Sequence, residues 1–282
     1  MDAETDAPHL RLPRVHWQGD TRHEDGDEVV REEPLEIRIG GVPVAVVMRT
    51  PGHDEELALG FLAIEGVVDE PAHVRSVRHC TVVDDPQSEN NVIQATLAPG
   101  VEVDLARLRR NLFASSSCGL CGKATIDQVM VRCEPLTDEL RVPVDWLHSL
   151  PGRLRAAQTV FARTGGLHAA GLFEAGGEAL VVREDVGRHN AVDKVVGWAL
   201  RRGRLPLAGH VLMISGRVAY EITLKAAAAG IPVLAAVSAP SSLAIDMATR
   251  AGLTLVAFVR DGRLAVYTRD ARVVAGRASS PA

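Results

Sequence analysis

The chain has 282 residues, of which 46% are hydrophobic, and its formal net charge is −5. This length and composition allow one large hydrophobic core or two smaller ones. The acidic balance argues against a nucleic acid as the main partner, because proteins that bind its backbone carry a basic surplus. The N-terminus has no signal-peptide pattern, and no apolar run approaches the roughly 18–20 residues that span a bilayer. We therefore expect a cytoplasmic protein with no membrane partner.

The first half of the chain predicts a tail followed by a small α+β subdomain. Residues 1–27 are rich in Asp, Glu, His and Pro with little apolar periodicity, which predicts a disordered tail. Two strand-like runs within 35–48 flank Gly40-Gly41, a hairpin signal. Acidic residues and then apolar residues at helical spacing predict a helix from about residue 54. Further strands are expected at 74–83 and 91–97. We assign 28–145 to this N-terminal subdomain, which carries the Cys118-x-x-Cys121 loop.

The second half, residues 146–275, alternates short apolar strands with amphipathic helices. This alternation predicts a second domain with an α/β layered fold and a largely parallel sheet. The expected strands are 167–173, 179–183, 211–214, 231–237, 253–259 and 264–268. The expected helices lie around 154–161, before Arg201-Arg202-Gly203, and at about 218–229 and 241–251.

Polar residues collect just after several of these strands. Arg188 and His189 follow one strand, Arg217 follows the next, and Arg260 follows another. Ligands of open α/β sheets bind outside the carboxyl ends of the strands, where helix N-termini favour anions. The serines at such positions are explained by helix capping alone, but several arginines are not. The pattern therefore favours a site for a phosphate-bearing ligand.

Cys118 and Cys121 form the most informative local pattern. They follow three serines, are flanked by glycines and precede Lys123 at the expected start of a helix, which favours reactive thiolates. Three chemistries fit: a persulfide carrier, dithiol–disulfide exchange, or half of a zinc site. Zinc is disfavoured because no second Cys-x-x-Cys supplies the remaining ligands. A thioredoxin-like pair would follow an early strand, so sulfur transfer is favoured.

Four stretches in this order make the chain recognisable as similar to the FdhD family, the sulfur carrier proteins required for formate dehydrogenase activity. The resemblance covers about 28 to 270. The stretches are Ser-Ser-Cys-Gly-Leu-Cys-Gly (116–122), Arg-Thr-Gly-Gly-Leu-His-Ala-Ala-Gly-Leu-Phe (163–173), Arg-Glu-Asp-Val-Gly-Arg-His-Asn-Ala-Val-Asp-Lys (183–194) and Ser-Gly-Arg-Val-Ala-Tyr-Glu (215–221).

The resemblance implies a sulfurtransferase of the persulfide carrier type. Members of this family take sulfur from a cysteine desulfurase and deliver it to the molybdenum cofactor before that cofactor enters formate dehydrogenase. Cys118 matches the cysteine that carries the persulfide, and Cys121 would assist. The acceptor is the bis-molybdopterin guanine dinucleotide form of the cofactor, with no permanent cofactor of the protein's own. Its matching binding segment comprises Phe258, Val259, Arg260, Asp261, Gly262 and Arg263, to which the residues themselves add Arg188, His189 and Arg217. A homodimer is implied.

The resemblance also implies a three-layer α/β/α sandwich similar to the cytidine deaminase fold. Deaminase chemistry and its metal site are not expected. That chemistry needs His-x-Glu and Pro-Cys-x-x-Cys around zinc, whereas Ala169 follows His168 and Ser117 precedes Cys118. The alternatives that stay open are a cofactor-binding chaperone without sulfur transfer and a thiol redox or zinc-binding protein.

Overall fold

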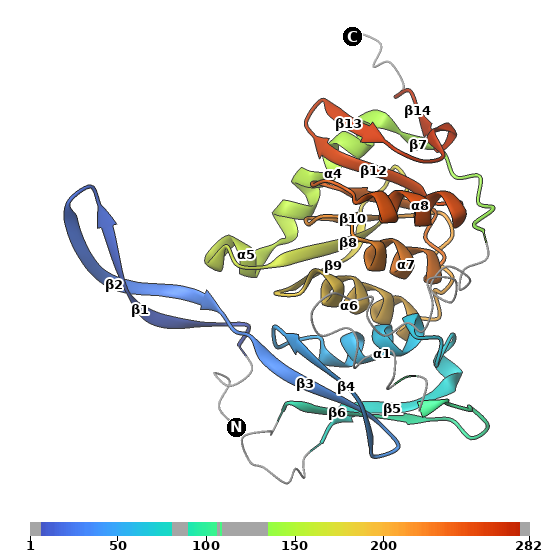
Figure 1. The fold of residues 1–282 in the computed structure, drawn as a ribbon, viewed down its shortest axis with the longest axis horizontal. Coiled ribbons are helices and arrows are strands. Elements are labelled where there is room, and N and C mark those ends of the chain that lie inside the picture. The colour runs from blue at the N-terminus through green and yellow to red at the C-terminus, as the bar shows by residue number, and fades with distance from the viewer. Residues whose placement is uncertain (1–6, 81–89, 106–107, 109–134, 277–282) are drawn as a thin grey trace.

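Two sheets separated by helices form the body of the molecule in the computed structural model, and a hairpin projects from one side (Figure 1). The structure describes residues 7–80, 90–105, 108 and 135–276. A four-stranded sheet belongs to the N-terminal half and a six-stranded sheet to the C-terminal half. Helices from both halves meet between the two sheets (Figure 1). The mixed α/β fold class expected from the sequence is confirmed.

The projecting hairpin replaces the predicted tail. Strands β1 (His9–Gln18) and β2 (Thr21–Val30) pair antiparallel along their whole length. The prediction of a tail without regular structure is therefore wrong for residues 9–27. Charge pairs across the two strands stabilise the hairpin. Because its sequence has little apolar periodicity, the pattern used to predict strands does not reveal it. Arg14 contacts Asp25 at 2.9 Å and Asp27 at 2.7 Å.

The four-stranded sheet follows the predicted pattern closely. Its order is β4-β3-β6-β5. Gly40 and Gly41 both take positive φ, which glycine reaches without steric cost, and they make the tight turn between the first two strands. Helix α1 (Asp54–Ile64) packs on this sheet through Leu57, Phe61 and Leu62. The strands are β3 (Glu33–Ile39), β4 (Val42–Arg49), β5 (Val74–His79) and β6 (Val92–Leu97), with a short 3₁₀ helix, η1 (Pro71–His73), before β5.

The six-stranded sheet is mixed, so the prediction of a largely parallel sheet is wrong. Its order is β13-β12-β11-β10-β8-β9. The pairs β10–β11 and β11–β12 are parallel, while β8–β9, β8–β10 and β12–β13 are antiparallel. Tight turns join β8 to β9 and β12 to β13, and a tight turn permits only antiparallel pairing. The strands are β8 (His168–Glu174), β9 (Ala179–Asp185), β10 (His210–Ile214), β11 (Val233–Ala236), β12 (Thr254–Arg260) and β13 (Arg263–Val266).

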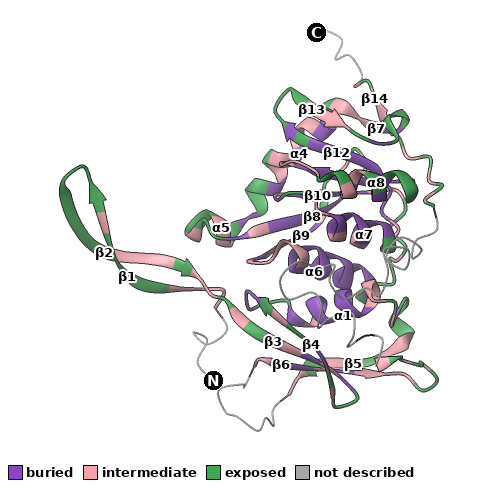
Figure 2. Cartoon of the chain, in the orientation of Figure 1, coloured by how far each residue is buried: buried purple, intermediate pink, exposed green. Residues whose placement is uncertain are grey.

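Helices cover both faces of this sheet. Helices α6 (Arg188–Arg201), α7 (Tyr220–Ala228) and α8 (Ser242–Arg250) bury one face, and α4 (Val144–Ala157) buries the other. Buried residues concentrate in these layers, whereas the hairpin is mostly exposed (Figure 2). The likeness to the cytidine deaminase fold stays a prediction. The remaining elements are α5 (Thr159–Thr164), β7 (Val142–Pro143), η3 (Asp270–Arg272) and β14 (Val273–Val274).

Two glycines bring α1 and α6 into very close contact. A Cβ on Gly60 would lie 1.8 Å from the carbonyl oxygen of Asp193, and one on Gly197 would lie 1.8 Å from that of Glu56. Only glycine allows two helix backbones to approach this closely. The crossing therefore joins the two halves of the chain, and Leu200 of α6 packs in the core under the four-stranded sheet.

Candidate anion-binding edge

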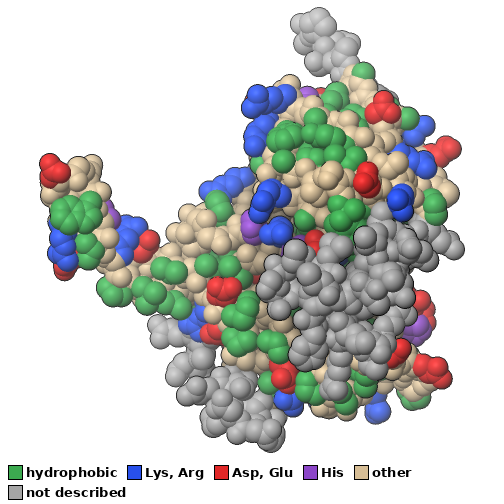
Figure 3. Space-filling view, viewed as in Figure 1, with side chains coloured by type: hydrophobic (Ala, Val, Ile, Leu, Met, Phe, Trp, Pro, Cys, Tyr) green, Lys and Arg blue, Asp and Glu red, His purple; other side chains and the backbone are tan. Residues whose placement is uncertain are grey.

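The carboxyl ends of four strands lie at one edge of the six-stranded sheet. Strands β9 and β10 both run antiparallel to β8, and β10, β11 and β12 run parallel, so β9, β10, β11 and β12 all end at the edge where β8 begins. This topology brings Arg188, Arg217 and Arg260 to one edge, as the sequence predicted. On the face shown in Figure 3, Lys and Arg side chains gather around a His side chain near this edge. We call this edge of the six-stranded sheet the basic edge.

The centre of the basic edge is built around Gly216, just after β10. A Cβ at Gly216 would lie 3.3 Å from Nδ1 of His168 and 3.6 Å from Cδ of Arg188. The turn is held in place because the backbone N–H of Ala169 donates to Oγ of Ser215 at 2.9 Å, and the N–H of Ser215 donates to the carbonyl of Ala169 at 3.0 Å. A glycine here lets the first residue of β8 and the first residue of α6 converge.

Electrostatics at this point favours an anionic ligand. Burial, with Arg188 and Arg217 nearby, lowers the pKa of His168. Burial, with Lys225 and Arg188 next in weight, lowers the pKa of His189 to about 3. Both imidazoles are therefore neutral at physiological pH, while the guanidinium groups stay charged. Oε2 of Glu221 lies 4.0 Å from Nε2 of His189.

Two polar atoms at the start of α6 are buried without a hydrogen-bond partner among the described residues. They are Nε of Arg188 and Nε2 of His189. Leaving such atoms unpaired costs about 1–3 kcal/mol each. An acceptor-rich ligand at the basic edge would remove that cost for Arg188, whose Nε–H is a donor. Helix α6 also has no acidic residue in its first turn, so its N-terminal dipole is not neutralised by its own side chains.

The segment 258–263 forms the far end of the basic edge, at the turn between β12 and β13. Phe258 adopts a left-handed φ of 53° beside an irregularity in the β12–β13 register, and its side chain is 43% exposed. Val259 is fully buried in the core under α4, so the structure gives a ligand no access to it. Arg260 donates from Nη1 to the carbonyls of Val237 and Val259. Asp261, Gly262 and Arg263 are exposed.

Several polar residues of the 183–194 stretch are structural anchors. Asp185 is fully buried, and its Oδ2 lies 2.7 Å from Nζ of Lys194. The same carboxylate accepts from the backbone N–H groups of Thr50 and Gly187 and from the side chain of Asn190. Because Thr50 belongs to the first half of the chain, this network fixes the start of α6 against the N-terminal sheet.

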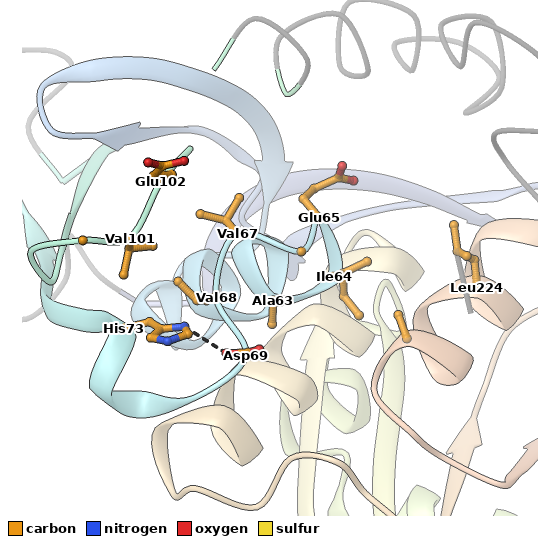
Figure 4. Close-up of a pocket in the computed structure, with 13 residues that line it drawn as sticks. Ala63, Ile64, Glu65, Val67, Val68, Asp69, His73, Val101, Glu102 and Leu224 are labelled. Atoms are coloured by element: carbon orange, nitrogen blue, oxygen red, sulfur yellow. Dashed lines mark ion pairs between the residues drawn. The ribbon is translucent and has the colours of Figure 1, made fainter. Parts of the chain in front are cut away.

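A cavity of about 650 Å³ lies elsewhere, between the end of α1 and helix α7 (Figure 4). Ala63, Val67 and Val68 point into it, and His73 pairs with Asp69 at 2.9 Å on its wall. Its lining contains no Lys or Arg among the described residues. The cavity therefore does not have the chemistry of an anion site and is separate from the basic edge.

The cysteine pair lies outside the described residues, as does Cys133. Cys80 is described, half-buried and free. Within the described ranges, no group of three or more His, Cys, Asp or Glu side chains is placed to hold a metal ion. Among the helices that the structure describes, none is both long and apolar enough to cross a membrane.

Comparison with known proteins decides the family. The model of the FdhD/NarQ family matches residues 30–274. The chain belongs to the FdhD/NarQ family. It is 52% identical over 250 residues to a protein of Mycolicibacterium paratuberculosis named sulfur carrier protein FdhD, covering 88% of this chain and 92% of that protein. A protein of the same name from Anaeromyxobacter dehalogenans is 46% identical over 256 residues, covering 88% of each chain.

A solved structure supports the same family. It is that of a formate dehydrogenase accessory protein from Desulfotalea psychrophila. The two structures align with a TM-score of 0.75 at 26% sequence identity, covering 95% of this chain and 100% of that one. The family resemblance expected from the four sequence stretches is thus confirmed.

The sequence analysis did not assign His168 to the basic edge of this FdhD/NarQ family member. His168 lies in a strand-like run, and a lone histidine there is usually a satisfied core residue. The structure instead places it at the first position of β8, beside Arg188 and Gly216. The missing information was the antiparallel direction of β8, which turns the beginning of that strand toward the carboxyl ends of its neighbours.

Proposed function

We propose that this FdhD/NarQ family member carries sulfur from a cysteine desulfurase to the molybdenum cofactor required by formate dehydrogenase. Cys118 holds the sulfur as a persulfide, and the basic edge binds the acceptor, bis-molybdopterin guanine dinucleotide. The observation that supports this most directly is the buried, unpaired Nε–H donor of Arg188 at the start of α6, with Arg217 at the same edge near His168. The names of relatives at about half sequence identity support the sulfur-carrying role.

The acceptor is a large anion, and the basic edge suits its separate parts. Guanidinium groups bind phosphate oxygens through two parallel N–H bonds, which Arg188 and Arg217 can supply. A neutral His189 avoids a buried charge and leaves the site polar. Phe258 presents an exposed ring from a left-handed backbone position, a conformation that a non-glycine residue adopts at a cost. We assign that ring to stacking on a guanine base.

The two cysteines divide the sulfur chemistry between them. The Cys118 thiolate attacks the terminal sulfur of the desulfurase persulfide, which forms Cys118–S–S⁻ and releases the desulfurase thiol after proton transfer. Cys121 then attacks Sγ of Cys118, so that a Cys118–Cys121 disulfide forms and hydrosulfide leaves for the molybdenum. The two electrons that reduce the transferred sulfur come from the cysteine pair. A cellular dithiol must afterwards reduce the disulfide.

Two further expectations belong to this proposal. The reaction takes place in the cytoplasm, where the desulfurase and the dithiol reductant operate. The protein acts as a homodimer, as the family resemblance implies.

The test is sulfur loading followed by intact mass measurement. The purified protein is incubated with a cysteine desulfurase and cysteine, with and without a reductant. We expect a mass gain of one sulfur atom that the reductant removes and that Cys118→Ser abolishes. Cys80→Ser is the matched control, because Cys80 is a free, half-buried cysteine away from the motif, and it should load normally. Loading of Cys118→Ser to the wild-type level would refute the assignment.

A cofactor-binding chaperone without sulfur transfer is the second candidate. The observation that favours it is the unpaired Nε–H of Arg188 at the basic edge, which an anionic ligand would bind whether or not sulfur is transferred. The two functions differ in their variants. A carrier loses sulfur delivery in Cys118→Ser but still binds guanosine diphosphate, the probe for the cofactor's nucleotide end. A chaperone loses its whole activity with Arg217→Ala and is indifferent to loading of Cys118.

A further inference from the structure

We propose that the cleft between the end of α1 and helix α7 is a docking site for a basic amphipathic segment of a partner protein. The cleft consists of two adjoining hollows, of about 650 Å³ and about 580 Å³, which share part of their lining. We call the two together the acidic cleft. The segment that fits it carries Lys or Arg side chains beside apolar ones. Such docking is distinct from the sulfur transfer proposed above. The residues that line both hollows are Ala63, Ile64, Val68, Asp69, His73 and Ala228.

The floor of the acidic cleft is apolar. Ile64 and Val68 line both hollows, Leu224 of α7 lines the first, and Leu205 lines the second. Ile64 and Leu205 are only partly buried, so each leaves apolar surface uncovered on the floor. Ligand sites in proteins occupy about 300–1,000 Å³, and each hollow falls within that range. The cleft therefore has room for several apolar side chains of a partner.

Carboxylates surround this apolar floor. Glu65 and Glu102 line the first hollow, Asp69 lines both, and Glu70 lines the second. Figure 4 shows the carboxylates of Glu65 and Glu102 together at one rim of the cleft. Among the described residues on either lining, His73 is the only basic side chain, and it pairs with Asp69 at 2.9 Å and Glu70 at 3.3 Å. Glu102 is exposed, and no described residue forms an ion pair with it. The rim therefore attracts cations.

The helices that bound the acidic cleft add to this negative potential. Ile64 is the last residue of α1 and Ala228 is the last residue of α7. The C-terminal end of a helix carries about half a negative elementary charge, which favours a cation placed beside it. Helix α1 has no basic residue in its last turn, and the last-turn Lys225 of α7 is paired with the buried Asp193. The charge at these two helix ends is thus not neutralised at the cleft by their own side chains.

The acidic cleft and the basic edge lie at opposite ends of the same two helices. Helix α6 begins with Arg188 at the basic edge, and α7 begins three residues after Arg217. Both run toward the cleft, where Leu205 follows α6 and Ala228 ends α7. The 14 residues of α6 span about 21 Å at 1.5 Å per residue. A partner in the cleft therefore leaves the basic edge open, so both can be occupied at once.

Charge complementarity decides the class of occupant. The carboxylates repel a nucleic acid or a nucleotide, and a purely apolar ligand would bury them without partners at a cost. A small polyamine would match the charges but leave the floor formed by Ile64, Val68 and Leu205 bare. A protein segment with apolar side chains flanked by Lys or Arg satisfies both parts of the cleft. Amphipathic helices bind hydrophobic grooves in this way.

A fluorescently labelled probe peptide tests the acidic cleft. The peptide has leucine at helical spacing and lysine elsewhere, and its control has glutamate in place of each lysine. In anisotropy titrations the lysine peptide should bind, more weakly as salt is added, and the glutamate peptide should not. Ala228→Arg places a cation where both hollows meet and should weaken binding by about tenfold or more. Ala157→Arg is the matched control, because Ala157 is the exposed last residue of α4, lines neither hollow and gives the same change in net charge.

A milder variant keeps the test valid if Ala228→Arg fails to fold. Glu102→Gln removes one exposed carboxylate from the rim and should weaken binding of the lysine peptide by about twofold to fivefold. Glu139→Gln removes an exposed carboxylate outside the cleft and should leave binding unchanged.

Three results would overturn the proposal. The first is failure of the lysine peptide to bind. The second is equal binding by folded Ala228→Arg and Ala157→Arg, or by Glu102→Gln and Glu139→Gln, because the attraction would then belong to the net charge of −5 and not to the cleft. The third is spermidine binding as tightly as the peptide, which would replace the protein segment by a small polyamine as the occupant.

Discussion

Replacing Gly197 by alanine tests whether the α1–α6 crossing holds the two halves together. The new Cβ would lie 1.8 Å from the carbonyl oxygen of Glu56 and 2.7 Å from the backbone nitrogen of Gly60. Both neighbours are helix backbone atoms, which cannot rotate away. The two helices must separate by more than about 1 Å, because real Cβ atoms essentially never come within 3.0 Å of another heavy atom.

The expected change in the free energy of unfolding is the cost of overpacking and lost side-chain contact, less the gain in helix propensity. Overpacking of this kind costs about 1–3 kcal/mol, and a radial gap of about 0.5–1 Å removes a quarter to a half of the dispersion energy between side chains that share the core at this crossing, such as Leu57 and Leu200. Alanine recovers about 0.8–1.0 kcal/mol of helix propensity over glycine. We expect Gly197→Ala to lower the free energy of unfolding by about 2 kcal/mol or more.

Urea unfolding followed by circular dichroism measures this effect, and the chain supplies its own control. Gly152 lies in α4, is exposed, and has no heavy atom within 4 Å of the position of an added Cβ. Gly152→Ala should therefore raise the free energy of unfolding by up to about 1 kcal/mol, as propensity alone dictates. If Gly197→Ala is stabilised as much as Gly152→Ala, the close crossing is not present in solution.

Three further changes probe the anchors and the basic edge. Lys194→Met leaves the buried Asp185 carboxylate without its cation and should cost about 3–5 kcal/mol in urea unfolding, most of which Lys194→Met/Asp185→Asn should restore; equal losses in the single and double variants would refute the pairing. The pKa of His189, about 3, lies below its ordinary 6.5, so unfolding binds a proton between these values and stability falls as pH drops through them. As the pH falls below 6, the free energy of unfolding of His189→Gln should therefore decrease by up to about 1.4 kcal/mol per pH unit less than that of the wild type. If the free energies of unfolding of the two proteins fall in parallel with pH, the low pKa is contradicted. Phe258→Gly should relieve the left-handed backbone by about 1 kcal/mol in thermal unfolding while weakening guanosine diphosphate binding in calorimetry, whereas unchanged binding would remove Phe258 from the site.

The sequence predicted those parts of the fold whose signals are local. The Gly40-Gly41 turn, helix α1 and the strand–helix alternation of the second half all have periodicity or turn residues that identify them. The β1–β2 hairpin escaped prediction because its strands are stabilised by charge pairs and backbone hydrogen bonds instead of a buried face. Strand direction also escaped, because an apolar run does not reveal which neighbour it pairs with.

The arginines of the basic edge could be predicted because their signal is also local. Arg188, Arg217 and Arg260 follow strands, and position after a strand is visible in the sequence. Asp185 follows a strand as well, yet its carboxylate is consumed by Lys194 and by backbone N–H groups from the first half of the chain. No local pattern distinguishes a charged residue that meets a ligand from one that joins two segments 135 residues apart in the chain.

The contact between Gly60 and Gly197 has a consequence for synthesis on the ribosome. Helix α1 emerges long before α6, and until α6 arrives the glycine-containing face of α1 has no helix to cover it. The carboxylate of Asp185 and the amine of Lys194, which fix Thr50, are also made late. The N-terminal half must therefore wait, with part of its apolar surface bare, until residue 201 has left the exit tunnel. Truncated chains that end before α6 should be substrates for chaperones and proteases in place of stable fragments.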